Sequence, residues 1–215
     1  MAYGKGVQLD HLVYAVRDLD AGIASIERLI GVRAAMGGKH TGRGTHNALL
    51  SLGTGSYLEI IAPDPEQPPP SEPRAFGLDR LREPRLVTWA VRVPDMDDRA
   101  SKAVVAGYDP GPILPFSRRL PDGGELRWRL TLPAIRSGDG LIPFMIEWAP
   151  GPHPSQTAPA GAMLVDLQGD YLASHGIEPA AGPLIARATA LLEGCRQRRV
   201  PIIHVWTTIH RDDDR

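Results

Sequence analysis

A repeated strand–helix pattern constrains the fold of this chain more than any other feature. The apolar segment 9–16 (L-D-H-L-V-Y-A-V) precedes a helical pattern that begins at Asp18, and segment 85–93 (R-L-V-T-W-A-V-R-V) precedes a second one near Asp95. A shift of 77 residues places Asp18 on Asp95, and Y-L-E-I-I-A-P aligns with F-M-I-E-W-A-P at the shared Ala-Pro. Two such units can bury one sheet face under helices and curve the other around a cavity.

The first unit carries clear helix signals. Asp18 is a suitable N-cap, and Gly31 stands where a glycine ends a helix. Between them, apolar residues recur at helical spacing, at Leu19, Ile23, Ile26 and Ile30. The stretch 64–73 (D-P-E-Q-P-P-P-S-E-P) reads as a stiff connector, because proline suits neither a helix interior nor a central strand.

The C-terminal segment has a different pattern. An apolar strand starts near residue 162, an amphipathic helix follows from about 183, and V-P-I-I-H-V-W-T-T reads as a second buried strand. This order is typical of a parallel α/β unit. A lone unit of this kind exposes strand edges, so we expect it to pack on the first domain, to dimerise or to remain poorly ordered.

Composition excludes several classes of partner. The formal net charge of -1 gives no footprint for nucleic acid or an anionic membrane. The single cysteine, Cys195, excludes an internal disulfide and fits a reducing compartment. No stretch approaches the roughly 18 apolar residues of a membrane span, and no signal peptide is visible. We therefore expect a cytoplasmic protein with a small-molecule substrate.

Strand alternation selects the candidate site residues. In the first strand it places His11 on an otherwise apolar face, where it is either a buried structural histidine or part of a site. In segment 57–62 it places Glu59 between Tyr57 and Ile61 on one face. In the strand around Trp128, Arg127 and Arg129 share the opposite face, where they either clamp an anion or are simply solvated. Arg118 and Arg119 fall in an expected loop and receive no role.

These segments resemble the glyoxalase-like domains of the vicinal-oxygen-chelate superfamily. The resemblance rests on five segments in order over about residues 7–160, namely L-D-H-L-V-Y-A-V-R-D-L-D, G-R-G-T-H-N-A-L-L-S-L-G, S-Y-L-E-I-I-A-P-D-P, G-G-E-L-R-W-R-L and I-P-F-M-I-E-W-A-P-G-P-H-P-S. It implies an α+β fold in which paired βαβββ modules form a cupped sheet. We assign modules to 1–63 and 85–152, the connector to 64–84 and an incomplete α/β segment to 153–215.

The resemblance also implies a divalent metal in the cup. His11 matches the first-strand histidine, Glu59 matches the fourth-strand glutamate, and Glu147 stands near its counterpart in the second module. The counterpart of His11 is Thr88, a poor ligand, so His46 would have to complete the set. Such a set suits Zn, Ni, Mn or Fe(II). The alternative is that the glutamates are solvated and the cavity binds an organic ligand without metal.

The implied function is that of a lyase, isomerase or dioxygenase acting on a small oxygen-rich metabolite. Glu59 or Glu147 would serve as catalytic base, with Arg127, Trp128 and Arg129 contacting the substrate. Paired modules in this superfamily often assemble into dimers, which makes a homodimer possible. A metal-free binding module of the same fold is the rival from a different class.

Segment 161–215 resembles the start of an isochorismatase-like cysteine hydrolase. L-V-D-L-Q-G-D-Y-L and R-V-P-I-I-H-V-W-T-T-I-H-R-D-D-D carry this resemblance, and Asp166 matches the first catalytic residue of that family. The lysine and the nucleophilic cysteine of that family have no counterparts, since Cys195 lies on the apolar face of the expected helix. We therefore predict that this segment is inactive as it stands, and that the chain combines a glyoxalase-like domain with part of a hydrolase. The alternative is a packed C-terminal extension, which some members of the glyoxalase-like family carry.

Overall fold

The computed structural model describes residues 6–53, 55–119, 124–132, 140, 142–160, 163–165, 189, 190, 193, 197 and 202–204. The chain divides into two compact units, 1–160 and 161–215. The first contains β1 (Gln8–Ala15), α1 (Leu19–Ile30), β2 (Ala35–His40), β3 (Thr45–Ser51), β4 (Tyr57–Pro63), the 3-10 helix η1 (Ala75–Arg80), β5 (Arg85–Arg92), α2 (Met96–Val105), β6 (Ile113–Arg119), β7 (Glu125–Thr131), β8 (Phe144–Trp148) and α3 (Pro154–Thr157).

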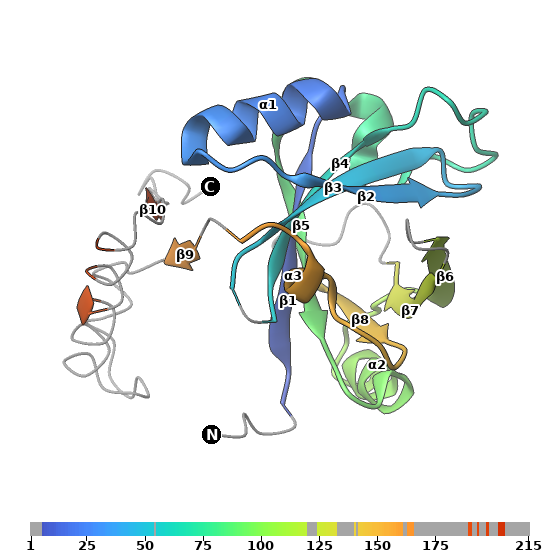
Figure 1. Ribbon diagram of the computed structural model, residues 1–215. Helices are drawn as coiled ribbons and strands as arrows, with labels where there is room; N and C mark the ends of the chain where they lie inside the picture. Colours follow the sequence, from blue (N-terminus) through green and yellow to red (C-terminus); the bar gives the residue numbers. More distant parts are fainter. Residues whose placement is uncertain are drawn as a thin grey trace, which may run out of the picture. The chain divides into compact units, whose positions relative to one another are not determined.

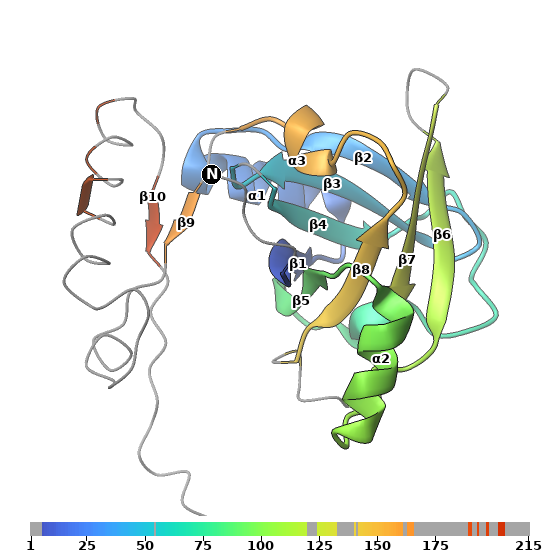
Figure 2. The same ribbon diagram turned by 90° about the horizontal axis from the view of Figure 1, so that it is seen from below.

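The strands of the first unit form one eight-stranded sheet, in the order β2-β3-β4-β1-β5-β8-β7-β6. The two strand–helix–strands repeats meet where β1 pairs antiparallel with β5. Within each repeat the first and last strands are parallel neighbours, β1 with β4 and β5 with β8. The sheet curves so strongly that its two edge strands, β2 and β6, contact each other (Figure 2). This cupped sheet confirms the predicted architecture.

Helix α1 forms as its sequence predicts. Asp18 caps its N-terminus by accepting a hydrogen bond from the Ala21 amide at 2.8 Å, and Gly31 ends it in the left-handed conformation at φ 74°. Its apolar stripe is buried against β3 and β4, while α2 packs against β8 (Figure 1). Both helices thus cover the convex side of the sheet. No helix in the described part of the chain has the length and apolar character of a membrane span.

The connector between the repeats is partly ordered as η1. Two of its residues, Phe76 and Gly77, have positive φ values of 59° and 70°. Phe76 is the unusual one, because a side chain of that size rarely adopts this conformation. Its ring stacks on Phe144 of β8, with ring centroids 5.5 Å apart. The connector is therefore fixed to the second repeat by an aromatic contact.

The second unit contains β9 (Met163–Val165) and β10 (Ile202–His204), which pair in parallel with Ile202 opposite Met163. Parallel neighbours need a crossover connection. Most of residues 166–201, including Asp166 and Cys195, lie outside the described residues. The complete βαβ unit therefore stays a prediction.

Candidate functional site

The concave face of the sheet encloses a cavity of about 1020 Å³. Both repeats and the connector contribute to its lining. Its walls are mostly apolar and aromatic, and include Tyr57, Ile61, Phe76, Leu114, Phe116, Leu126, Trp128, Leu130, Phe144, Ile146 and Trp148. The lining also contains polar and charged residues, among them the exposed Arg43, Arg80 and Arg85. A volume of this size with apolar walls and polar groups among them is typical of small-molecule sites.

A β-bulge in β1 shapes the polar end of this cavity. On β5, the neighbouring residues Val91 and Ala90 pair with Leu9 and His11, so Asp10 is the extra residue. In a regular strand, consecutive side chains point to opposite faces. The bulge breaks that alternation and brings the Asp10 carboxylate to within 2.7 Å of its neighbour's ring, at Nδ1 of His11.

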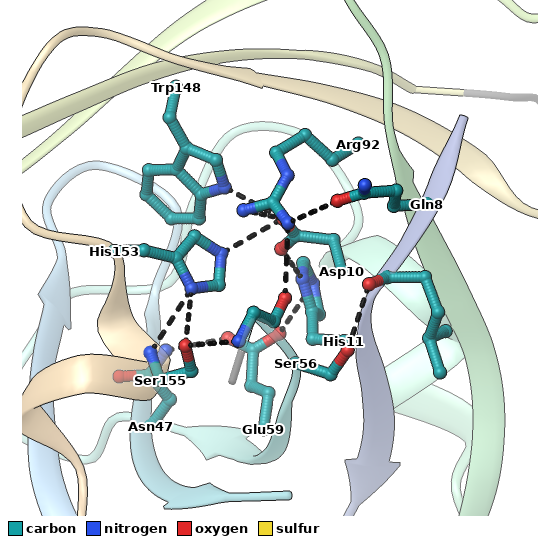
Figure 3. A network of polar contacts seen from close by, with 12 residues as sticks. Gln8, Asp10, His11, Asn47, Ser56, Glu59, Arg92, Trp148, His153 and Ser155 are labelled. Atoms are coloured by element: carbon teal, nitrogen blue, oxygen red, sulfur yellow. Dashed lines mark hydrogen bonds and ion pairs between the residues drawn. The ribbon is translucent and has the colours of Figure 1, made fainter. Parts of the chain in front are cut away.

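Asp10 is the centre of a buried polar network (Figure 3). It is fully buried, and its Oδ2 accepts a hydrogen bond from Trp148 Nε1 at 2.9 Å. His153 Nε2 lies 3.0 Å from the same oxygen, and Arg92 Nη1 lies 3.9 Å from it. Since the Ser155 amide donates to Nδ1 of His153, the proton of that ring is on Nε2 and points at the carboxylate. Asp10 therefore ties β1 to β5, β8 and the segment before α3.

The network keeps Asp10 ionised. Burial alone raises the pKa of this carboxyl, but hydrogen bonds and charge interactions with His11 and His153 lower it by more, so the pKa lies well below its usual value. An ionised carboxylate can only accept hydrogen bonds. The His11 ring must therefore carry a proton on Nδ1, which directs Nε2 toward Glu59.

Aromatic neighbours fix the orientation of the His11 ring. Tyr57 stacks on it with ring centroids 4.6 Å apart, and Phe144 meets it edge-on at 5.4 Å. Burial raises the pKa of Tyr57 well above its usual value, so this phenol stays neutral. His11 itself is only 3% exposed. A ring held by one hydrogen bond and two aromatic contacts has little freedom to rotate.

Glu59 lies next to the free ring nitrogen of His11. In the parallel register of β1 and β4, Tyr57 stands opposite His11 and Glu59 opposite Val13, which brings Glu59 onto the same face. Its Oε2 lies 3.7 Å from His11 Nε2, and its Oε1 accepts a hydrogen bond from Asn47 Nδ2 at 2.6 Å. Glu59 is 7% exposed. An imidazole and a carboxylate this close in an apolar cavity can pass a proton to or from a bound molecule.

His40 of β2 borders the same carboxylate. Its Nε2 lies 4.0 Å from Glu59 Oε1 and 3.3 Å from Asn47 Nδ2, while its Nδ1 contacts Thr45 Oγ1 at 2.9 Å. Burial lowers the pKa of His40, and the charge of Glu59 offsets this only in part. His40 is therefore neutral at physiological pH.

The sequence matches the glyoxalase-like domain family over residues 9–181. The chain belongs to the glyoxalase-like domain family. The match covers all of the cupped sheet and extends past residue 161, and it gives no evidence for an isochorismatase-like domain after it. No curated protein matches this glyoxalase-like chain.

Several solved structures are similar to part of this glyoxalase-like chain. A hypothetical protein from Staphylococcus aureus is 15% identical at a TM-score of 0.48, covering 67% of this chain and 60% of that protein. Methylmalonyl-CoA epimerase from Mycobacterium tuberculosis is 23% identical at a TM-score of 0.45, covering 71% and 94%. A variant of the Streptomyces coelicolor methylmalonyl-CoA epimerase, in complex with 2-nitronate-propionyl-CoA, is 20% identical at 0.44, covering 66% and 98%.

The structure brings together some of the residues that the sequence selected. His11 and Glu59 face each other in the cavity, and Trp128 lines its wall. His46 lies on the opposite face of β3, with Nδ1 4.0 Å from Asp64 Oδ1, because Thr45, Asn47 and Leu49 are the residues of that strand that line the cavity. The expectation that His46 enters the cavity is therefore wrong.

The predicted charged residues of β7 and β8, unlike Trp128, lie on the convex face. Glu147 accepts hydrogen bonds from Arg129 and from the Met96 amide at the start of α2. Arg127 pairs with Glu125 at 2.6 Å. The alternate residues of these strands line the cavity instead. Glu147, Arg127 and Arg129 therefore do not line the cavity, because their side chains point to the opposite face of the strands.

The four metal ligands implied by the resemblance lie on two different faces of the sheet. His46 and Glu147 are on the convex side, whereas His11 and Glu59 are in the cavity. Among the residues that the structure describes, no group of three or more His, Cys, Asp or Glu side chains is arranged to hold a metal ion. The described residues therefore do not form the four-ligand metal site that the resemblance implies.

Sequence reasoning missed several polar groups of this site, His40 among them. Asp10 holds the His11 ring, His153 in turn contacts Asp10, and Asn47 holds Glu59. Arg118, expected in a loop, is part of β6 and lines the cavity. The alternation of β3 could have indicated Asn47, since it stands two residues from Thr45 and Leu49, but both faces of that strand carry polar and apolar residues.

Replacing Asp10 by asparagine should destabilise the fold. The amide keeps the shape but removes one acceptor and the charge, leaving buried donors unsatisfied, so we expect a loss of about 1–3 kcal/mol in the free energy of unfolding. Chemical denaturation measures this loss. Asp98→Asn, which changes an exposed carboxylate on α2, is the control and should have a far smaller effect. Equal losses in the two variants would contradict the central position of Asp10.

Buried His40 should make stability depend on pH. Its folded pKa lies below the ordinary value of 6.5, so below about pH 6.5 the unfolded chain binds a proton that the folded chain does not. The free energy of unfolding should therefore fall as pH drops from about 7 to 5, and fall less in His40→Gln. Urea denaturation at several pH values tests this, and identical slopes in the two proteins would refute it.

Proposed function

We propose that the protein is an isomerase or lyase that moves a proton to or from a carbon atom next to a carbonyl group in a small oxygen-rich metabolite. The observation that carries this proposal is the pairing of Glu59 with His11, whose other ring nitrogen is held by the buried Asp10. Membership of the glyoxalase-like family supports it at the level of the fold.

Each residue then has a defined part in the reaction. Glu59 removes the proton from the acidic carbon, and the carbonyl oxygen takes up the resulting charge as an enolate. His11 returns a proton from Nε2, because Asp10 stabilises the positive ring that this step requires, as the aspartate of a catalytic triad does. After an isomerisation Glu59 carries an extra proton and His11 lacks one. Proton exchange with solvent returns both groups to their starting states. The apolar walls exclude water from the enolate.

Exchange of substrate hydrogen for deuterium tests this proposal. Phenylpyruvate and 4-phenyl-2-butanone, each with acidic hydrogens beside a carbonyl, serve as probes in deuterated buffer, and NMR follows the loss of their proton signals above the rate without protein. We expect catalysed exchange of at least one probe. Glu59→Gln should slow it about 10²–10⁴-fold, the usual contribution of a general base.

Glu147→Gln is the matched control for that variant. It makes the same chemical change on the convex face, where Glu147 contacts Arg129 and the start of α2 rather than the cavity. Its exchange rate should equal that of the wild type. An equal loss in both variants, or exchange no faster than the rate without protein, would overturn the proposal.

A metal-free binding module is the second candidate. The aromatic walls of the cavity favour it, because they can hold a ligand without any chemistry. Tight binding of a probe without catalysed exchange would select this function over the first.

The finer sequence-based expectations remain proposals. They comprise metal-dependent lyase or dioxygenase chemistry, a cytoplasmic location, a homodimer, and a hydrolase-like segment over 161–215 that contains Asp166. Elemental analysis of the purified protein beside Glu59→Gln tests the first of them.

A further inference from the structure

Arg118 is a buried cation inside the cavity. It belongs to β6, the edge strand that lies beside β2 at the other edge of the sheet (Figure 2). Its side chain reaches residues of β2 and β3. The residue is only 8% exposed and lines the cavity. A guanidinium keeps its charge under all ordinary conditions.

The fold makes room for this side chain. A Cβ atom at Gly37 would lie 2.6 Å from Arg118 Nη1, and one at Gly38 would lie 2.6 Å from its Cδ. Contacts that short essentially never occur, so a larger residue at Gly38 would force the arginine to move, and one at Gly37 would force both Asn47 and the arginine to move. Two adjacent glycines in β2 thus allow the guanidinium to lie against the backbone of the opposite edge.

The partners of Arg118 do not neutralise it. Its Nη1 donates to Asn47 Oδ1 at 3.3 Å, and its Nε is buried with no hydrogen-bond partner among the described residues. Within the same residues, no carboxylate lies within 4.0 Å of the guanidinium. Burial lowers the pKa of Arg118, while the nearby Tyr57 and Glu59 offset this in part. A buried charge without a counterion is costly, and a bound anion would remove that cost.

We propose that Arg118 is the anion anchor of the cavity and that the ligand is a molecule with an apolar body and a carboxylate group. The planar fork of a guanidinium matches a carboxylate, and the aromatic walls match the apolar body. The proposal rests on the proposed function, for which it names the substrate class.

Asn47 sets the position of that carboxylate relative to the acid–base pair. Its Oδ1 accepts from Arg118, and its Nδ2 donates to Glu59. One side-chain amide thus separates the anion anchor from the base. A carboxylate bound to Arg118 would lie close to Glu59. The carbon that Glu59 deprotonates would then be only a few bonds from that carboxylate. The substrate class is therefore an oxo acid whose acidic carbon is near its carboxylate.

Calorimetric binding of two matched probes tests the anchor without any turnover. The probes are 4-phenylbutyrate and its neutral amide, 4-phenylbutyramide. The wild type should bind the carboxylate roughly tenfold to a hundredfold more tightly than the amide, as expected for charge-assisted hydrogen bonds. Equal affinities, or no saturable binding of the carboxylate, would overturn the proposal, and this comparison needs no variant.

Arg118→Gln should remove the preference for the carboxylate while leaving amide binding within about twofold of the wild type. Arg127→Gln, at an exposed arginine on the convex face, is the control and should keep the full preference. A preference that survives in Arg118→Gln would contradict the anchor. Equal affinities in the wild type with catalysed exchange intact would refute this inference alone, whereas a wild-type preference for the carboxylate without catalysed exchange would refute only the proposed function.

Discussion

The carboxylate of Asp10 is the interaction on which the rest of this site depends. It is fully buried, and it accepts hydrogen bonds from side chains of three separate parts of the chain. Such a group is stable only if every donor around it is in place. The bulge that turns it toward His11, the packing of Trp148 and the position of His153 therefore have to form together. Fold and acid–base chemistry are linked through one residue.

Closure of the sheet is the second condition for function. The two repeats join along β1 and β5, and the curvature that follows brings the outer strands β2 and β6 into contact. Arg118 crosses from one edge to the other, and two glycines leave space for it. His11 and Glu59 come from the first repeat and the buried Arg118 from the second. A single repeat would hold only half of the cavity, which explains why duplication suits this fold.

Local patterns predicted the elements of this fold better than its polar contacts. His11 and Glu59 were found because regular alternation places them on one face of adjacent strands. His46 was assigned to the wrong face, since both faces of β3 carry polar and apolar residues and do not show which one lines the cavity. Asp10 was missed because a bulge leaves no signal in the sequence. Arg118 was missed because its neighbours belong to the opposite edge of the sheet, 71 residues away in the chain at Asn47.

The protonation of His11 tests the account most directly. If Asp10 holds the ring as described, Nδ1 carries a proton in a strong hydrogen bond to the carboxylate. Nitrogen-15 NMR of labelled imidazoles, assigned with a His11→Gln variant, reports which ring nitrogen is protonated. We predict a protonated Nδ1 whose proton resonance moves upfield in Asp10→Asn. An unprotonated Nδ1, or a resonance that the substitution leaves unchanged, would contradict the account.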